Sequence, residues 1–186
     1  MKKILAYSHH LLEEVVRQGD TVMDATCGNG NDTFFLSQLV KEDGNVFAFD
    51  IQEKALENTS TLLSKNNIQN VKLIHDGHEN CEKYIPTNDE LAGAIFNLGY
   101  LPKGDHQIIT TPQNTIRAIQ SILTRLRPNG RIVIVVYHGH MGGKEEKEKV
   151  LDFCGNLDQS YYQVLQYQFI NQINHPPFII AIEKLC

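Results

Sequence analysis

Two acidic residues flank a glycine-rich turn near the start of the chain. Asp24 precedes the turn and Asp32 follows it, and within the turn Gly28 and Gly30 permit backbone conformations that a Cβ would block. Thr33 stands where the dinucleotide fingerprint would place its third glycine. A helix is expected to begin near Asp32, a good N-cap residue. A pyrophosphate site avoids anions, so the two acidic residues beside the turn disfavour NAD and ATP as ligands. They favour S-adenosylmethionine, which bears an amino group and a sulfonium.

Further polar residues follow the second and third predicted strands. Asp50 lies about 20 residues beyond the glycine turn, where a carboxylate can accept both ribose hydroxyls of a nucleotide. Its alternative role is the N-cap of the next helix. Asp76-Gly77-His78 follows the third strand, where its residues can contact an adenine amino group. A purely structural role for Asp76 or His78 is an equal alternative. The three strand ends together are more specific than any one of them.

The fourth predicted strand ends in a loop whose residue spacing fits amine chemistry. Asn97-Leu98-Gly99-Tyr100 resembles the Asn-Pro-Pro-Tyr loop of amine-methylating enzymes, with both prolines replaced. The Asn97 side-chain oxygen and the backbone carbonyls that follow can accept hydrogen bonds from a target N–H group and aim its lone pair at a methyl carbon. Tyr100 can then stack on a nucleobase. The alternative is a turn with a buried tyrosine.

A primary amine must attack in its neutral form, so such a site needs a route for a proton. Asp105, Tyr100 and His138, on loops at one mouth, are candidates to accept or relay it, and the sequence does not rank them. Methyl transfer has an activated leaving group, so proximity and orientation supply most of the acceleration and no nucleophilic side chain is required. We therefore predict catalytic roles for Asn97, Tyr100, Asp105 and His138.

The loop after the fifth predicted strand contains two histidines among glycines. His138 and His140 have no third acidic or thiol partner nearby, so we predict no metal site. Gly139 and the Gly142-Gly143 pair make the loop pliable and suited to face a substrate. The later stretch Asn174–Phe178 either closes the same mouth or forms only an edge turn.

Four lysines have two alternative roles. They form either a basic rim for RNA or part of a solvated helix face, because glutamates alternate with two of them. The four are Lys103, Lys144, Lys147 and Lys149.

These loops must be positioned by the strands and helices that alternate along the chain. Short β-rich segments are separated by amphipathic helical patterns, which predicts a mostly parallel sheet covered on both faces. The short polar connection Asn171–His175 favours an antiparallel C-terminal hairpin at one edge. We expect a doubly wound, Rossmann-like α/β sheet of seven strands, with its ligand at the carboxyl ends of the strands. The predicted strands are Thr21–Ala25, Asn45–Asp50, Val71–His75, Leu91–Asn97, Gly130–Tyr137, Tyr162–Phe169 and Phe178–Glu183, and the predicted helices are Leu5–Arg17, Asp32–Val40, Gln52–Asn66, His78–Tyr84, Gln113–Leu126 and Lys144–Cys154.

Length and composition indicate one domain, with an N-terminal helix in residues 1–19 and a core in residues 20–186. A formal net charge of −5 argues against nonspecific coating of nucleic acid and still allows a local basic face. The 4 cysteines form no C-x-x-C pair and indicate neither a zinc knuckle nor a disulfide framework. The apolar run Ile132–Tyr137 is too short to span a bilayer, and Glu13-Glu14 interrupts any signal-peptide pattern. We expect a cytoplasmic protein that has no membrane association.

Several segments together resemble one family. Asp24-Ala-Thr-Cys-Gly-Asn-Gly-Asn-Asp-Thr33, Phe49-Asp-Ile-Gln52, Phe96-Asn-Leu-Gly-Tyr-Leu-Pro102 and Tyr137-His-Gly-His140 with Gly142-Gly143 look like the small class I methyltransferases once labelled rRNA methylases. The resemblance covers essentially the whole chain. It implies a cytoplasmic bacterial enzyme that uses S-adenosylmethionine to convert 5-aminomethyl-2-thiouridine, at the wobble position of tRNA, to the 5-methylaminomethyl form.

Carried over by position, the resemblance implies two groups of site residues. The glycine turn holds the methionine part of the cofactor, the next two strand ends hold its ribose and adenine edge, and the loops after the fourth and fifth strands face the nucleotide. His9-His10 also fits, and His10 is the one expected to reach the site. The implied cofactor residues are Asp24, Cys27, Gly28, Asn29, Gly30, Asn31, Asp32, Thr33, Asp50, Ile51, Gln52, Asp76, Gly77, His78 and Asn97, and the implied substrate residues are Leu98, Gly99, Tyr100, Lys103, Tyr137, His138, His140, Gly142 and Lys144.

The expected partner is the anticodon stem-loop of a tRNA. A homodimer is compatible with the limited contact area of one small subunit. The choice of tRNA over rRNA rests on the resemblance alone. Other hypotheses are a methyltransferase for rRNA or a small-molecule amine, and a module that binds S-adenosylmethionine without catalysis. The Asn97–Tyr100 loop favours an enzyme over a module.

Overall fold

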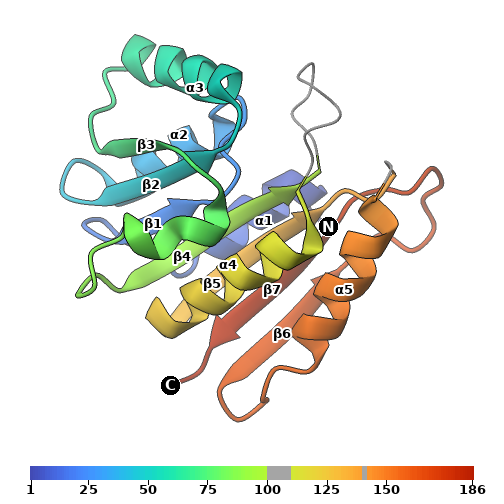
Figure 1. Cartoon of the computed structure of the whole chain (residues 1–186). Helices are drawn as coiled ribbons and strands as arrows, with labels where there is room; N and C mark the ends of the chain where they lie inside the picture. The colour runs from blue at the N-terminus through green and yellow to red at the C-terminus, as the bar shows by residue number, and fades with distance from the viewer. Residues whose placement is uncertain (100–109, 140–141) are drawn as a thin grey trace.

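In the computed structural model, seven strands form one sheet in the order β3-β2-β1-β4-β5-β7-β6 (Figure 1). The structure describes residues 1–99, 110–139 and 142–186. Strands β1 to β5 pair in parallel, and β7 pairs antiparallel with both β5 and β6. This confirms the predicted doubly wound sheet with an antiparallel C-terminal hairpin at one edge. The strands are β1 (Thr21–Asp24), β2 (Asn45–Asp50), β3 (Val71–His75), β4 (Leu91–Leu98), β5 (Leu126–Val136), β6 (Tyr162–Tyr167) and β7 (Phe178–Lys184).

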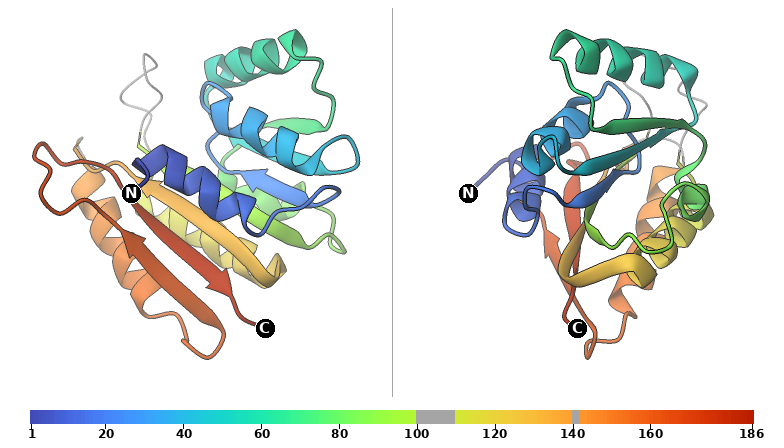
Figure 2. Two further views of the ribbon diagram at one scale, coloured as in Figure 1. Left: turned by 180° about the vertical axis from the view of Figure 1, so that it is seen from behind. Right: turned by 90° about the vertical axis from the view of Figure 1, so that its left-hand side faces the viewer.

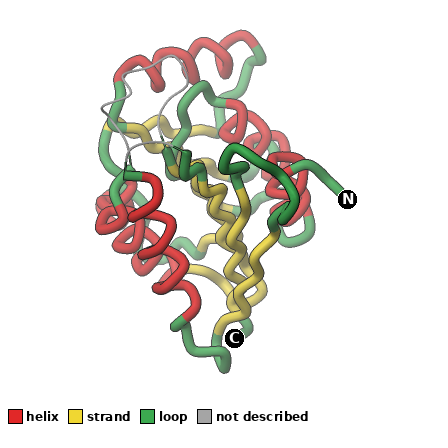
Figure 3. Tube along the Cα trace, turned by 90° about the vertical axis from the view of Figure 1, so that its right-hand side faces the viewer, coloured by secondary structure: helices red, strands yellow, loops and turns green. Residues whose placement is uncertain are grey.

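Helices cover both faces of the sheet. Figure 2 shows α1 lying across the back of the sheet, on the same side as α2, whereas α4 and α5 cover the front. Figure 3 shows the strands as a central layer that has helices on both sides. The helices are α1 (Ile4–Glu13), α2 (Asn31–Val40), α3 (Glu53–Lys65), the 3-10 helix η1 (His78–Lys83), α4 (Pro112–Arg125) and α5 (Gly143–Gly155). No helix in the described ranges is long and apolar enough to cross a membrane.

The central strands are buried on both faces, which explains why their sequences are apolar without alternation. On the α1 face, Leu12 and Leu36 pack in one cluster with Val133. On the opposite face, Phe96 of β4 packs in a second cluster with Ile119 of α4. Packing on both sides fixes the strands, so the loops at their carboxyl ends begin from a rigid edge.

The N-terminal helix is shorter than predicted. Helix α1 ends at Glu13 rather than Arg17, and residues 14–15 form a turn. The Arg17 guanidinium donates to the carbonyls of Glu13 and Glu14 at 3.0 and 2.6 Å, and the Arg17 N–H donates to Asp20 Oδ2 at 2.7 Å. These bonds satisfy the last carbonyls of the helix.

Strand β5 begins at Leu126 rather than Gly130. Its register with β4 shifts between Leu91 and Gly93, and Asn129 has a positive φ of 60° within the irregular part. The Pro-Asn-Gly sequence at residues 128–130 is thus accommodated as an irregularity inside a strand longer than predicted.

Candidate functional site

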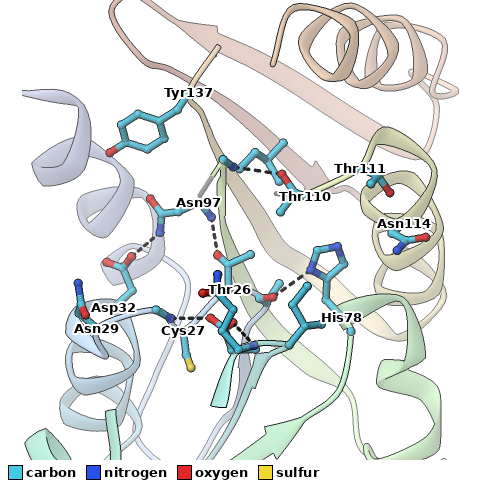
Figure 4. Close-up of a pocket in the computed structure, with 18 of the residues that line it drawn as sticks. Thr26, Cys27, Asn29, Asp32, His78, Asn97, Thr110, Thr111, Asn114 and Tyr137 are labelled. Atoms are coloured by element: carbon cyan, nitrogen blue, oxygen red, sulfur yellow. Dashed lines mark hydrogen bonds between the residues drawn. The ribbon is translucent and has the colours of Figure 1, made fainter. Parts of the chain in front are cut away.

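A pocket of about 980 Å³ opens at the carboxyl ends of the central strands, as expected for a doubly wound sheet. The glycine turn, the ends of β2 to β5 and the first turn of α4 contribute to its wall (Figure 4). Helix α1 also reaches the pocket, through Leu5 and His9. Of the predicted site residues, the lining includes Cys27, Gly28, Asn29, Asn31, Asp32, Asp50, Ile51, Gln52, Asp76, Gly77, His78, Asn97, Leu98, Gly99, Tyr137 and His138.

Gly30 ends the glycine turn and is the N-cap of α2. Its φ of 83° lies in the left-handed region, and a Cβ there would stand 2.9 Å from Thr59 Oγ1 and 3.0 Å from Thr59 Cα. The Gly30 N–H donates to the Cys27 carbonyl at 2.8 Å and closes the turn. The prediction that Asp32 caps the helix is therefore wrong. Asp32 lies in the first turn of α2, and its carboxylate contacts other elements.

Asp24 stands behind the turn rather than in the pocket. Its side chain is fully buried, Oδ2 accepts the Thr33 hydroxyl at 2.6 Å, and Oδ1 accepts the Thr26 N–H at 3.1 Å. Burial, and after it the charge of Asp32, raises the pKa of Asp24 to about 7. Asp24, Gly30 and Thr33 do not line the pocket. The expected direct contact of these three with the cofactor is corrected to a role in shaping the turn.

Asp50, at the end of β2, is hydrogen-bonded to the glycine turn. Its Oδ2 accepts the Gly28 N–H at 3.0 Å, and its Oδ1 accepts the Gln52 N–H at 2.9 Å. The N-cap of α3 is Gln52, so the alternative role of Asp50 as the N-cap is wrong. Each carboxylate oxygen has more than one lone pair, so Asp50 can still accept hydrogen bonds from hydroxyl groups in the pocket.

The Asp76 carboxylate at the end of β3 is already engaged by the protein. It accepts hydrogen bonds at 2.8 Å from the Gly77 N–H, the Asn80 amide and the Tyr84 hydroxyl. Burial alone would raise the pKa of Asp76, but these hydrogen bonds lower it overall. Asp76 therefore has the structural role that the sequence left open, and it also lines the pocket.

His78 presents a buried acceptor atom. Its Nδ1 lies 3.0 Å from the Ala25 carbonyl oxygen, which can only accept, so this nitrogen carries the proton. Burial lowers the pKa of His78, and the ring is neutral. Nε2 is then an acceptor, and it has no hydrogen-bond partner in the part of the chain that the structure describes.

Asn97, at the end of β4, is fixed at two points. Its N–H donates to Thr26 Oγ1 at 2.7 Å, and its side-chain Nδ2 donates to Asp32 Oδ2 at 2.5 Å. A carboxylate only accepts, so the amide nitrogen faces Asp32 and the amide oxygen faces away from it. Figure 4 shows this oxygen on the side of Tyr137. The pocket wall thus presents the acceptor that the predicted role of Asn97 requires.

The histidine that reaches the pocket is His9, not His10. His9 Nε2 lies 2.5 Å from Asp32 Oδ1. His10 instead lies 3.6 and 3.7 Å from the carboxylates of Glu13 and Glu14, and it does not line the pocket. Neighbouring residues of an α-helix project about 100° apart, so the two rings cannot share one face. The expectation for His10 is wrong.

The buried Glu146 of α5 connects the segments that follow β4 and that begin α4. The Gly99 N–H donates to Thr110 Oγ1 at 3.1 Å, and the Thr110 N–H donates to the Gly99 carbonyl at 3.2 Å. Glu146 of α5 accepts the Thr110 hydroxyl at 2.7 Å and the Thr115 hydroxyl at 2.8 Å. The start of α5 is therefore bonded to the end of β4 and the start of α4.

Part of the pocket lining was not predicted from the sequence. Thr111-Pro112 is a helix-start signal that places the first turn of α4 at this edge of the sheet, and it could have indicated some of these residues. The lining residues that were not predicted are Leu5, His9, Ala25, Thr26, Glu79, Thr110, Thr111 and Asn114.

Aromatic residues stand at the mouth of the pocket. Tyr137 and His138 line it, and His175 joins them with its ring centroid 5.6 Å from that of His138. The stretch Asn174–Phe178 therefore contributes to the mouth rather than forming only an edge turn. Burial, and after it the charge of Asp32, raises the pKa of Tyr137, so its phenol stays protonated at neutral pH.

Two predicted substrate residues do not line the pocket. Gly142 is the N-cap of α5, and Lys144 is exposed with Nζ 3.9 Å from a Glu148 oxygen. Lys149 pairs with Glu145 at 2.6 Å on the same helix, so the solvated-face alternative describes both lysines. Four further predicted residues lie outside the described ranges, namely Tyr100, Lys103, Asp105 and His140.

The described part of the pocket wall is acidic. It contains the carboxylates of Asp32, Asp50, Asp76 and Glu79, and neither lysine nor arginine. Such a wall attracts ammonium and sulfonium groups and opposes a phosphate. This set of carboxylate acceptors fits S-adenosylmethionine.

Comparisons with known proteins agree with this geometry. The chain is 38% identical over 192 residues to the "tRNA (mnm(5)s(2)U34)-methyltransferase, chloroplastic" of Arabidopsis thaliana. The aligned region covers 98% of this chain and 70% of that protein. A crystal structure of a "putative rRNA-methylase" from Clostridium thermocellum is 49% identical with a TM-score of 0.96 and covers 100% of this chain and 99% of that one. A "putative methyltransferase" from Streptococcus mutans, in complex with SAH, is 47% identical with a TM-score of 0.92 and the same coverage.

The fold, the pocket and these similarities define an S-adenosylmethionine-dependent methyltransferase. Residues 46–183 match the model of one methyltransferase family in particular. The chain belongs to this family, which is described as "Putative rRNA methylase".

Proposed function

We propose that the chain methylates the primary amine of 5-aminomethyl-2-thiouridine at the wobble position of tRNA, giving the 5-methylaminomethyl form. The observation that carries the proposal is the Asn97 amide, which Asp32 holds by its nitrogen so that its oxygen faces away from Asp32. That oxygen accepts one N–H of the amine and so directs the nitrogen lone pair. Similarity over nearly the whole chain to a relative named for a tRNA uridine supports this choice of substrate.

The chemistry requires mainly orientation from the protein. Bound S-adenosylmethionine supplies a methyl group whose sulfur retains the bonding electron pair when the methyl leaves. The glycine turn and Asp50 would hold the cofactor at the ends of β1 and β2, and Asn97 would align the amine in line with the methyl group. The nitrogen lone pair forms the new N–C bond, and the amine then gives up a proton. Of the predicted acceptors, His138 lines the pocket.

The mouth of the pocket suits a base turned out of its stack. Tyr137, His138 and His175 line it, and aromatic rings there can stack on a pyrimidine. The acidic wall attracts the protonated aminomethyl group that the base carries. A small amine lacks the base that these rings would hold.

The direct test uses the purified chain, S-adenosylmethionine and an anticodon stem-loop that carries 5-aminomethyl-2-thiouridine. Mass spectrometry of the digested nucleosides should show the gain of one methylene on that nucleoside. A stem-loop with unmodified uridine and an rRNA fragment serve as controls. Methylation of the rRNA fragment or of a free amine alone would overturn the tRNA proposal, and the absence of any transfer would favour a binding module. Phosphate contacts also predict that stem-loop binding weakens steeply with salt.

A further inference from the structure

His9 takes no part in the proposed methyl transfer, although α1 brings it to the pocket wall. His9 comes from an N-terminal helix that precedes the sheet, and its Nε2 lies 2.5 Å from Asp32 Oδ1. We propose that His9 is a positioning residue that fixes the Asn97 amide through Asp32. The proposal rests on the proposed function, because it takes Asn97 as the group that orients the target amine.

The Asp32 carboxylate bridges two donors on opposite sides. Its Oδ1 is bonded to His9 and its Oδ2 to the Asn97 amide, both at 2.5 Å. A carboxylate bound at one oxygen can swing about its side-chain torsions, whereas one bound at both oxygens has a single orientation. His9 therefore determines where Asp32 presents its second oxygen, and that oxygen determines which way the Asn97 amide faces.

His9 is itself held rigidly. Its ring stacks on Phe35 of α2, with the centroids 3.8 Å apart and the planes 4° from parallel. The next turn of α1 is anchored by Leu11 and Leu12, which are buried in the core. The chain of contacts thus runs from α1 through α2 to the end of β4. Preorganisation of this kind lowers the cost of orienting a reacting group.

The Asp32 carboxylate stays in the pocket wall when the His9 donor is removed. Asp50, the carboxylate proposed for the ribose hydroxyls, is bonded to the N–H groups of Gly28 and Gln52 rather than to His9. Loss of the His9 donor should therefore slow the chemical step and leave cofactor affinity almost unchanged. A residue that merely stabilised the fold would instead lower the melting temperature.

Two substitutions separate the hydrogen bond from the stacking. His9→Phe keeps an aromatic ring against Phe35 but removes the donor, and His9→Gln keeps a donor near the Nε2 position but removes the ring. We expect His9→Phe to lower kcat on the modified stem-loop by roughly tenfold to 100-fold. Cofactor Kd by calorimetry should stay within about threefold. His9→Gln should recover most of kcat, and His10→Phe on the same helix is the matched control, expected to behave as the native chain.

A second readout does not depend on activity. The side-chain amide signals of Asn97, assigned by their loss in Asn97→Ala, should shift in ¹⁵N–¹H spectra of His9→Phe and remain near native positions in His9→Gln. Unchanged signals in His9→Phe would overturn the proposal, whatever happens to kcat. Full kcat in His9→Phe would overturn it as well. If the native chain did not methylate the stem-loop, the proposed function would fail, while the amide spectra would still decide whether His9 fixes Asn97.

Discussion

Thr33 donates a 2.6 Å hydrogen bond to Asp24, a carboxyl group that is fully buried behind the glycine turn. The bond spans the turn, since Asp24 ends β1 and Thr33 lies in the first turn of α2. Hydrogen bonds from Thr33 and Thr26 favour the charged form, but burial outweighs them and raises the pKa of Asp24 to about 7. The ionised carboxyl therefore costs the folded state stability at neutral pH.

The first prediction concerns this pH dependence. The folded pKa of about 7 exceeds the ordinary value of 3.8, so the folded state retains the proton more tightly than the unfolded chain. The stabilising contribution is fully present below about pH 4 and is lost as pH rises through about 7. Asp24→Asn removes the titration, so its free energy of unfolding relative to the native chain should rise over this window. Urea unfolding of both proteins across the window measures the difference, and a constant difference would contradict the prediction.

The second prediction compares two glycines of similar backbone conformation. Gly30 and Gly19 have φ values of 83° and 86°, but only at Gly30 would a Cβ meet other atoms, those of Thr59 at 2.9 to 3.0 Å. Gly19→Ala should cost about 1 to 2 kcal/mol for the left-handed backbone alone. Gly30→Ala should cost more because Thr59 must also move, and it should weaken cofactor binding. Chemical denaturation of both variants checks this order, and equal losses would show that Thr59 yields freely.

The third prediction concerns Asp50. Asp50→Ala removes the acceptor of two backbone N–H groups and the carboxylate proposed for the ribose hydroxyls. Loss of a hydrogen bond to a charged group costs about 1.5 to 3 kcal/mol, so cofactor Kd should rise by roughly tenfold to 100-fold. Calorimetry measures it, and Glu57→Ala on the exposed side of α3 is the control. Native affinity in Asp50→Ala would remove Asp50 from the cofactor site.

The fourth prediction concerns Asn97. Asn97→Ala deletes the amide oxygen that would receive the amine, so turnover should be abolished. Cofactor Kd should stay within roughly tenfold, or about 1.4 kcal/mol. Single-turnover methylation and calorimetry on the same samples separate the two effects. Asn66→Ala, in an exposed position at the end of α3, is the control. Surviving turnover would show that the amine is oriented by another group.

The sheet and the placement of the pocket could be predicted because each depends on local patterns. Apolar segments bounded by polar turns mark the strands, and parallel strands bring their carboxyl ends to one edge. Asp50 and Asn97, each at or near the end of a strand, therefore line the pocket as expected. Asp24 also ends a strand, but the sequence does not show that Thr33 lies near enough to satisfy it in a buried position.

The two histidines of α1 show why tertiary contacts limit such predictions. The spacing of His10 from Glu13 and Glu14 by three and four residues predicts pairing along the helix surface, and the structure has that pairing. His9 has no such local partner, because Asp32 and Phe35 are more than twenty residues away along the chain. Its position becomes evident only when α1 packs beside α2.

The position of β7 in the sheet affects the order in which the sheet can assemble during translation. It lies between β5 and β6 and is the neighbour with which β6 pairs in the sheet. During translation β6 emerges from the ribosome before β7, so it has no strand to join until residues 178–184 have followed. The five parallel strands can assemble while synthesis continues, and the edge hairpin is the last part of the sheet to close.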